Sequence, residues 1–425
     1  MTDHIIVGNG VAAVNAVEGI RDAGDDGNII IISEEQHPAY SRPLISYLLG
    51  EKVDNEAMTY RGEEFYERNE VEVRYNQRAA KINTGDKTVE TEDGSQIPYD
   101  DLLIATGGSP IKPPVENGNQ DGVFTFTKWS DVNEIRKYIK NKDAKSAAIV
   151  GGGLIGLKTA EALINQGIEV NIIELMDKIL SATFDKTASS LMESHLRSMG
   201  CNLHTGTTVE RIIGKEGVSG VLLKNGEKIE VDMVVFAIGV SPNVEVAECE
   251  GIEIKKGIVV NSSMKTSKKD VYAAGDVAEI PDILAGDRKP IAIWPNASRQ
   301  GYIAGMNMGG KDEAYEGSFA MNSVKIKDLA TISVGITDPE DDQYEILAEV
   351  DEENGAYKKA VIDENKLVGV IFVKNVDRAG IYTGLIRKGI NVTSFKKDLL
   401  DPNFGLIDLP EDYRRTLLSG EGMKL

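Results

Sequence analysis

Short runs of β-branched residues alternate with stretches of helical spacing at the start of the chain. Residues 4–7 form one apolar run, apolar residues then recur at helical spacing over 12–21, and residues 28–32 form a second β-branched run. Strand, helix and strand in this order make a βαβ unit, whose two strands lie parallel in one sheet. The pattern predicts an α/β fold.

The turn between the first strand and its helix carries Gly8, Gly10 and Ala13, a G-x-G-x-x-A motif. Glycines allow the backbone to bend tightly and to approach a pyrophosphate at the N-terminus of the helix. Glu34 follows the second strand, 26 positions after Gly8, where its carboxylate can accept hydrogen bonds from ribose hydroxyls. A tight turn without a ligand is the alternative, but strand, helix and acid together favour a dinucleotide site.

The same unit occurs a second time. Residues 146–150 form a strand, 157–166 a helix and 169–173 a second strand. The turn of this unit is a complete G-x-G-x-x-G motif, formed by Gly151, Gly153 and Gly156, and Glu174 follows the second strand. Two dinucleotides bound by one chain suggest electron transfer between them, most simply between a flavin and a nicotinamide.

The later part of the chain adds buried strands and a change of pattern. Three strands end in polar or glycine-containing turns: 101–105 before Thr106-Gly107, 233–238 before Gly239, and 271–274 before Gly275-Asp276. From about residue 318, alternating strands are followed by two helices, which predicts a separate α+β domain.

Composition narrows the class of protein. The 425 residues suffice for two or three domains, and 41% hydrophobic with 27% charged residues is typical of a soluble protein. No stretch reaches the roughly 18 apolar residues of a membrane helix, and the first strand begins so near Met1 that we expect no signal peptide. Only two cysteines occur, which fits a reducing compartment, so we expect a cytoplasmic protein. A formal net charge of −21 disfavours a nucleic-acid partner.

Four motifs in this order resemble those of the FAD-dependent pyridine nucleotide oxidoreductases: the two glycine turns, Ala105-Thr106-Gly107 and Ala274-Gly275-Asp276. The segments 40–46 (Tyr-Ser-Arg-Pro-Leu-Ile-Ser) and 294–297 (Trp-Pro-Asn-Ala) are similar to the branch of NADH–rubredoxin, ferredoxin and nitrite-reductase-like enzymes. The chain from Met321 onward is similar, more loosely, to the C-terminal domain of that branch.

The resemblance implies three domains. Residues 1–112 and 244–317 would form an FAD-binding domain, residues 113–243 an inserted NAD-binding domain, and residues 318–425 a C-terminal α+β interface or dimerisation domain. The expected fold is therefore α/β, with two Rossmann-like dinucleotide-binding domains and this third domain.

The resemblance also implies roles for individual residues. Asp276 would reach the flavin ribitol and pyrophosphate, or cap a helix after a strand, and the two roles are compatible. Arg42 and Pro43 would lie near the isoalloxazine ring, with a surface arginine before a turn as the alternative. Trp294 would line the flavin or nicotinamide cleft, or belong to the core.

The cofactor-binding residues that we expect from the motifs are Gly8, Gly10, Ala13, Glu34, Arg42, Pro43, Thr106, Gly107, Gly151, Gly153, Ile155, Gly156, Glu174, Gly239, Gly275 and Asp276. Arg42, Lys158 and Trp294 are the candidates for the reaction itself. At position 158 relatives often carry a glutamate close to the nicotinamide. A lysine there would alter nicotinamide placement or flavin potential, or simply point outward.

NAD is favoured over NADP. Glu174 can bond the ribose 2′-hydroxyl but would repel a 2′-phosphate, and Leu175-Met176 offers no cation beside it. Lys178 is the only basic residue close to Glu174 in the sequence.

The positions of the cysteines disfavour several reactions that relatives carry out. The segment 33–58 contains no cysteine, and we expect Cys201 and Cys249 to serve packing. Disulfide reductase, thiol peroxidase and cysteine-assisted oxidase activities are therefore disfavoured. Two cysteines cannot ligate a four-thiolate iron–sulfur cluster, and the four scattered histidines suggest no metal site.

The sequence thus predicts an FAD-dependent NADH:acceptor oxidoreductase. The acceptor would be a rubredoxin-like or ferredoxin-like protein, or an iron–sulfur subunit of a larger aldehyde or 2-oxoacid oxidoreductase complex. The acidity of the chain, its lack of a cluster and Lys158 favour the fixed subunit slightly. An NADH oxidase using oxygen and a non-catalytic FAD-binding assembly module are the alternatives. We expect a homodimer or a subunit of a hetero-oligomer.

Overall fold

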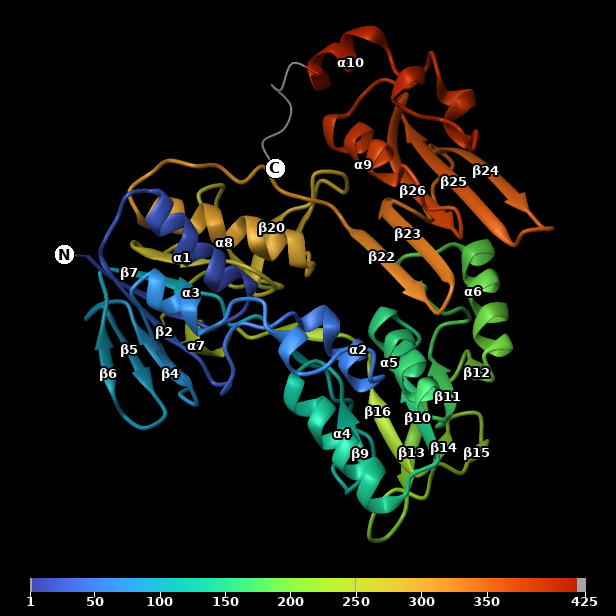
Figure 1. The fold of residues 1–425 in the computed structure, drawn as a ribbon, viewed down its shortest axis with the longest axis horizontal. Helices are drawn as coiled ribbons and strands as arrows, with labels where there is room; N and C mark the ends of the chain where they lie inside the picture. The colour runs from blue at the N-terminus through green and yellow to red at the C-terminus, as the bar shows by residue number, and fades with distance from the viewer. Residues whose placement is uncertain (1, 249, 419–425) are drawn as a thin grey trace.

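The computed structural model describes residues 2–248 and 250–418 of the chain. It contains two parallel five-stranded sheets and one antiparallel five-stranded sheet, each with its own helices (Figure 1). This architecture confirms the predicted fold class. Cys249, which we expected to serve packing, lies outside the described residues.

The first parallel sheet brings together strands from distant parts of the chain. Its order is β19 (Val271–Ala273), β7 (Asp101–Ile104), β1 (Asp3–Val7), β2 (Asn28–Ile32) and β3 (Val71–Arg74). The helices α1 (Val11–Asp22) and α8 (Trp294–Met308) lie side by side on it (Figure 1). Two short helices, α3 (Glu63–Arg68) and α7 (Glu245–Glu248), belong to the same part of the chain. So do two small three-stranded sheets. One consists of β4 (Ala79–Asn83), β5 (Thr88–Thr91) and β6 (Gln96–Pro98), and the other of β18 (Ile258–Val259), β20 (Ala278–Pro281) and β21 (Arg288–Lys289).

The second parallel sheet is built from a continuous stretch of the chain. Its order is β12 (Asn202–Thr205), β11 (Glu169–Glu174), β10 (Ser146–Val150), β16 (Met233–Phe236) and β9 (Val123–Thr125). Its helices are α4 (Trp129–Lys142), α5 (Leu154–Asn165) and α6 (Lys186–Ser198), and a small sheet of β13 (Val209–Ile213), β14 (Gly220–Leu223) and β15 (Lys228–Ile229) adjoins it. Helix α5 begins three residues earlier than expected because Gly153 serves as its N-cap, so Ile155 and Gly156 lie in its first turn.

The two connections between the parallel sheets run side by side. Strand β8 (Gly108–Pro110) pairs antiparallel with β17 (Val240–Pro242). Next to this ribbon, the Thr106 hydroxyl donates to the Asn243 carbonyl at 2.7 Å, and the Asn243 side-chain amide donates to the Thr106 carbonyl at 2.9 Å. The turn after β7 and the residue that follows β17 are therefore fixed to each other.

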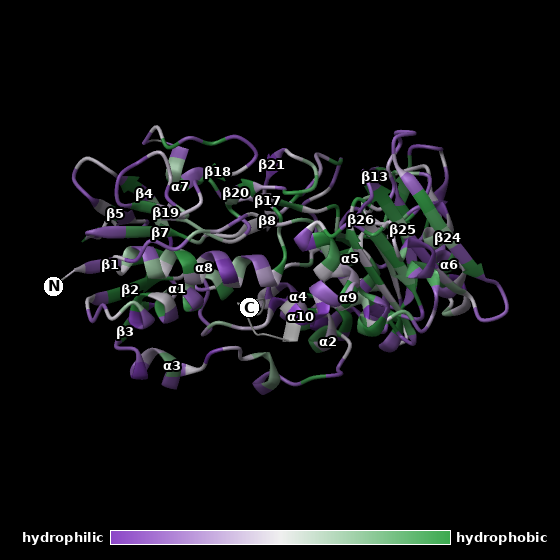
Figure 2. Cartoon of the chain, turned by 90° about the horizontal axis from the view of Figure 1, so that it is seen from above, coloured by the Kyte–Doolittle hydropathy of each residue, from purple (hydrophilic) through white to green (hydrophobic). Residues whose placement is uncertain are grey.

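The C-terminal sheet has the order β22 (Met321–Ile326), β23 (Leu329–Gly335), β26 (Lys366–Val373), β25 (Ala356–Asp363) and β24 (Glu345–Asp351). It is followed by α9 (Ala379–Lys388) and α10 (Glu411–Leu418). Green, hydrophobic residues follow β25 and β26 in Figure 2, where α9 and the adjoining turns cover the sheet. None of the helices in the described residues is long and apolar enough to cross a membrane.

A buried ionic contact fixes this sheet to the second parallel domain. Asp185 caps α6 by accepting from the Ala188 amide at 2.9 Å, and it also accepts from the Tyr357 hydroxyl at 2.6 Å and from Lys359 at 3.0 Å. Burial alone would raise the pKa of Asp185, but these hydrogen bonds outweigh burial and hold the pKa below its usual value. Asp185 is thus ionised where the domains meet.

Helices α1 and α8 approach so closely that side chains are excluded between them. A Cβ added at Gly301 would collide with the Ala12 carbonyl oxygen, and one added at Gly305 would collide with the Ala16 carbonyl oxygen. Ala12 lies opposite Gly301 and Ala16 opposite Gly305, so the two helices run in the same direction and the start of α1 faces the middle of α8.

We expect Gly305→Ala to destabilise this helix pair by about 1–3 kcal/mol, because the added methyl group meets a fixed backbone. Amide hydrogen exchange in α1 and α8 should become faster, as measured by mass spectrometry. Gly380→Ala is the matched control, since a Cβ at this exposed helical position has open space around it. Equal exchange in the two variants would contradict the close-approach argument.

Candidate active site

The first glycine turn forms an open cradle at the start of α1. Gly8 has φ +108°, and a Cβ there would collide with the Ala105 carbonyl oxygen, so only glycine fits. Gly10 is the N-cap and has open space around it, so the first N–H groups of α1 have no side-chain cap. Asn9 Nδ2 is buried without a hydrogen-bond partner, while its Oδ1 accepts from the Tyr66 hydroxyl at 2.9 Å. Free donors at a helix N-terminus fit the pyrophosphate of a dinucleotide.

The Gly275-Asp276 turn lies next to this cradle. Gly275 has φ +83°, packs against the Ala12 side chain and donates its amide to Gln300 at 2.8 Å. Burial raises the pKa of Asp276, and the positive charge of Arg42 opposes that rise. The fold therefore brings the Gly275-Asp276 turn close to both Ala12 and Arg42.

Two neighbouring acids follow strand β2 and take different partners. Glu34, 45% exposed, forms ion pairs with Lys128 and, at 3.8 Å, with Arg78. Glu35 accepts from Arg42 at 2.5 Å and from the Tyr40 hydroxyl at 2.8 Å. The sequence predicts Glu34 as a ribose ligand, and this stays a prediction; it did not reveal that the adjacent Glu35 orients Arg42.

The second glycine turn repeats the first in its essentials. Gly151 has φ +114°, and a Cβ there would collide with the Ala237 carbonyl oxygen. Gly153 is the open N-cap of α5, and Gly156 packs against the Gly151 carbonyl. The Glu174 carboxylate closes the turn by accepting from the Gly152 amide at 2.6 Å and from the Met176 amide at 2.8 Å. Gly239 has φ +115° and accepts from the Ile111 amide at 3.0 Å, at the base of the interdomain ribbon.

A cavity of about 290 Å³ lies where the three parts of the chain meet. Its walls come from the Arg42–Leu44 turn and α2 (Ile45–Leu49), from the start of α5, and from β22. The lining residues are Arg42, Pro43, Ile45, Ser46, Tyr47, Phe126, Leu154, Ile155, Lys158, Ser323, Val324 and Lys325. Four predicted site residues, Arg42, Pro43, Ile155 and Lys158, are therefore brought together, although they are distant in sequence.

Lys158 points into this junction, where its side chain is 16% exposed. Its ammonium group bonds Glu161, donates to the Lys325 carbonyl at 3.2 Å and lies 4.4 Å from the centroid of the Tyr47 ring. The outward orientation that the sequence left open is not adopted.

Glu161 joins all three parts of the chain. It is 5% exposed and accepts from Lys158, from Lys52 at 2.8 Å and from the Lys327 amide at 2.9 Å. Burial alone would raise its pKa, but these hydrogen bonds outweigh burial and hold the pKa below its usual value. The carboxylate that positions Lys158 is thus itself positioned by the C-terminal domain.

Trp294 and the described cysteine lie apart from this cavity. Trp294 starts α8 and packs edge-on against Tyr60, with ring centroids 5.1 Å apart. Its contact with a flavin stays a prediction. Cys201 is buried, and burial raises the pKa of its thiol to about 12, which leaves it unreactive.

The sequence missed Tyr47, Phe126 and the strand residues 323–325 as cavity walls. Tyr47 directly follows a segment that carried the family resemblance, so its neighbourhood was a signal. Residues 323–325 gave none, because nothing in a strand's sequence tells which distant helix it will face.

Within the described residues, no group of three or more histidine, cysteine or acidic side chains is placed to hold a metal ion.

We expect Glu161→Gln to lower stability by about 1–3 kcal/mol at pH 7, because two lysines lose their shared counter-charge. The lowered pKa of Glu161 means that its contribution is complete above the unfolded carboxyl pKa of about 4.3 and is lost as pH falls through the folded value. The difference between parent and variant in thermal unfolding should therefore shrink below about pH 4–5. Glu411→Gln, which removes an exposed ion pair with Arg415, should change little at any pH.

Known proteins resemble this arrangement over most of the chain. Residues 2–301 match the pyridine nucleotide-disulphide oxidoreductase family model, and residues 321–390 match the rubredoxin NAD+ reductase C-terminal domain. The solved structure of NADH:rubredoxin oxidoreductase from Clostridium acetobutylicum aligns with a TM-score of 0.78 and 26% identity, covering 94% of this chain and 98% of that one.

Two characterised relatives differ in how much of their length is matched. The nitrite reductase (NAD(P)H) of Bacillus subtilis (strain 168) is 32% identical over 400 residues, which are 94% of this chain and 49% of that protein. The NADH-dependent phenylglyoxylate dehydrogenase subunit epsilon of Aromatoleum evansii is 30% identical over 399 residues, 93% of this chain and 94% of that subunit. The chain thus spans about half of the first relative and nearly all of the second. It belongs to the pyridine nucleotide-disulphide oxidoreductase family of NAD(P)H-dependent flavoproteins that bind FAD, and it carries a C-terminal domain of the rubredoxin reductase type.

Proposed function

We propose that this chain passes electrons between NADH and an iron–sulfur protein or subunit through bound FAD. The observation that carries the proposal is the cavity at the junction of the three parts. The flavin-associated segment at Arg42 and the start of the NAD-associated helix α5 face each other there. No cysteine lines this cavity within the described residues, so no thiol is placed to take part in the reaction.

The residues that would hold FAD and NADH are those of the two cradles. The N-terminal N–H groups of α1 and the Asn9 amide fit the FAD pyrophosphate, and those of α5 fit the NADH pyrophosphate. Glu34 and Glu174 follow the second strand of each unit, where ribose hydroxyls are bound. FAD, when bound, supplies the chemistry, because it accepts two electrons from a nicotinamide and releases them singly to an iron–sulfur centre.

The chain's own contribution is position and charge. Pro43, Phe126 and Ile155 give the cavity apolar walls that exclude water, and Arg42 and Lys158 place two positive charges at its edge. Each charge is held by a carboxylate, Glu35 and Glu161 respectively, so neither must reorganise during the reaction. No general acid, base or nucleophile is required for hydride transfer.

The choice of an iron–sulfur partner is supported by the relatives. The matching C-terminal family model takes its name from rubredoxin reductase, and the relative matched over nearly its whole length is a subunit of a larger dehydrogenase. We therefore propose a cytoplasmic protein that works as a homodimer or as the NADH-reactive subunit of a complex. The domain limits proposed from the sequence and the residue roles above belong to the same proposal.

An anaerobic titration with NADH tests the function directly. We expect the flavin absorbance to bleach at about one NADH per FAD, and an iron–sulfur acceptor such as rubredoxin to restore it. Flavin that stays oxidised in the presence of NADH would identify a non-catalytic FAD-binding module instead. Oxygen consumption as fast as flavin reduction would favour an NADH oxidase.

Lys158→Met should lower the midpoint potential of the flavin and slow its reduction by NADH about tenfold, because a positive charge beside the cavity is lost. Stopped-flow reduction and a spectroelectrochemical titration measure the two quantities. Lys52→Met is the matched control: it removes the other lysine that bonds Glu161 but does not line the cavity. If both variants change the potential equally, the effect belongs to Glu161 and not to Lys158.

A further inference from the structure

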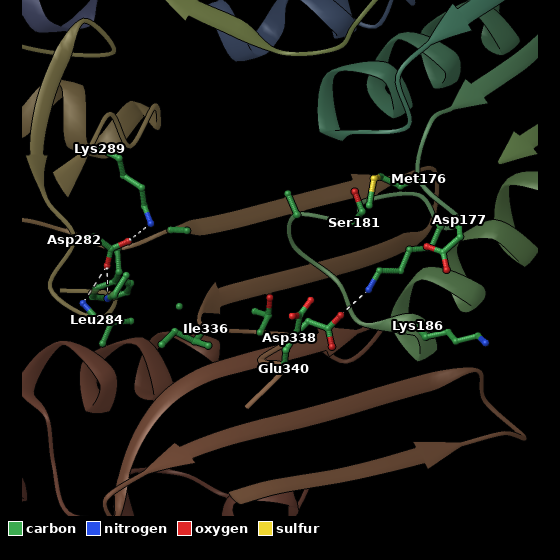
Figure 3. Close-up of a pocket in the computed structure, with 17 residues that line it drawn as sticks. Met176, Asp177, Ser181, Lys186, Asp282, Leu284, Lys289, Ile336, Asp338 and Glu340 are labelled. Atoms are coloured by element: carbon green, nitrogen blue, oxygen red, sulfur yellow. Dashed lines mark hydrogen bonds and ion pairs between the residues drawn. The ribbon is translucent and has the colours of Figure 1, made fainter. Parts of the chain in front are cut away.

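A second and larger cavity, of about 660 Å³, lies beside the loop that follows Glu174. It is bounded by residues 176–186 of the second parallel domain, by residues 282–289 next to β20, and by residues 319–340 of the C-terminal domain. Figure 3 shows Asp338 and Glu340 facing the loop that carries Met176, Asp177 and Ser181. The C-terminal domain therefore forms one wall of the space next to the expected ribose site.

Lys178 is the basic residue closest to Glu174 along this loop, and its ammonium group already has two partners. Its ammonium group forms an ion pair with Asp338 at 2.6 Å and donates to the Phe184 carbonyl at 2.9 Å. The Lys178 side chain is only 19% exposed, so these bonds fix its direction. Asp338 follows β23 and belongs to the C-terminal domain, whereas Lys178 follows β11.

The cavity is lined by two further lysines as well as by acids: Lys186 begins α6, and Lys289 is ion-paired with Asp282 at 2.9 Å. Both oxygens of Glu174 accept backbone amides, which keeps the carboxylate at the second glycine turn. Asp177 and Glu340 line the same cavity, and Leu175 and Met176 are 63% and 50% exposed. A 2′-phosphate beside Glu174 would be repelled by this carboxylate, and the charge of Lys178, the lysine nearest to Glu174 in the sequence, is already compensated by Asp338.

We propose that Asp338 determines the nucleotide preference of this protein by holding Lys178 away from the ribose 2′ position. The inference rests on the proposed use of NADH and deepens it: Glu174 excludes the 2′-phosphate by repulsion, and Asp338 withholds the cation that would compensate for it. Asp338 is a positioning residue, because it acts through Lys178. The C-terminal domain thereby takes part in selecting the nucleotide.

Asp338 can be replaced without breaking the Asp185–Lys359 contact between the domains. Asp338 is 44% exposed, and its other cationic neighbour, Lys359 at 3.8 Å, keeps its closer bond of 3.0 Å to Asp185. Replacing Asp338 by asparagine therefore removes the ion pair of Lys178 and leaves it only the bond to the Phe184 carbonyl, while the buried Asp185–Lys359 contact persists.

The experiment compares ADP-ribose and 2′-phospho-ADP-ribose as ligands of the FAD-loaded protein by isothermal titration calorimetry. In Asp338→Asn we expect the Kd of 2′-phospho-ADP-ribose to fall about tenfold relative to the Kd of ADP-ribose. The reasons are the loss of a repulsive charge and the loss of the ion pair that holds Lys178. Adding Lys178→Gln to this variant should reverse most of the change. Asp338→Glu keeps the ion pair and should behave as the parent does.

Glu340→Gln is the matched control, since it removes the same charge from the same loop without freeing Lys178. A purely structural role of Asp338 would weaken both ligands equally and leave the ratio unchanged, which would overturn the proposal. An equal shift in Glu340→Gln would overturn it as well, by showing a general charge effect. Because the readout is ligand binding, failure here is distinguishable from failure of NADH to reduce the flavin.

Discussion

The backbone leaves no room for a Cβ where β1 and β10 end, and the arrangement of the site depends on this constraint. At Gly8 and Gly151 the chain passes directly against the carbonyl oxygen of a neighbouring strand, at Ala105 and Ala237. Each helix can therefore begin at the edge of its sheet, with its first N–H groups free. Between the two sheets, the β8–β17 ribbon places Thr106 and Asn243 close enough to bond each other.

A second feature is that charged side chains of the NAD-associated domain find hydrogen-bond and ion-pair partners in the C-terminal domain. On α5, Lys158 is bonded to the end of β22 and Glu161 to the turn that follows it, and Lys178 is paired with Asp338. Partly buried charges are costly unless they are paired and hydrogen-bonded, so these contacts fix the C-terminal sheet in one position. Two separate cavities, one at each of these lysines, have a wall from that sheet.

Charged side chains that are held in pairs fit a protein that transfers electrons without acid–base chemistry of its own. The charged groups near the smaller cavity form pairs that hold one another in place, Arg42 with Glu35 and Lys158 with Glu161. Such pairs supply a fixed electrostatic environment, which is the protein's part in cofactor chemistry. The described cysteine is buried with a raised thiol pKa and lies among the packed residues of the second domain, which agrees with its expected structural role.

The sequence by itself determined the two βαβ units, the glycine turns, the acids after the second strands and the separate C-terminal α+β domain. These features are local: they depend on the period of apolar residues and on the steric freedom of glycine, which neighbouring residues in the chain decide. Only the tertiary structure decided that Lys158 points inward, that Glu35 holds Arg42, and that Asp338 is the partner of Lys178. Glu35 and Arg42 are only 7 positions apart, but the period of apolar residues does not specify which of two adjacent acids meets the arginine. Lys158 meets Lys325 across 167 positions and Lys178 meets Asp338 across 160, and which side chains meet across such distances depends on how whole domains pack.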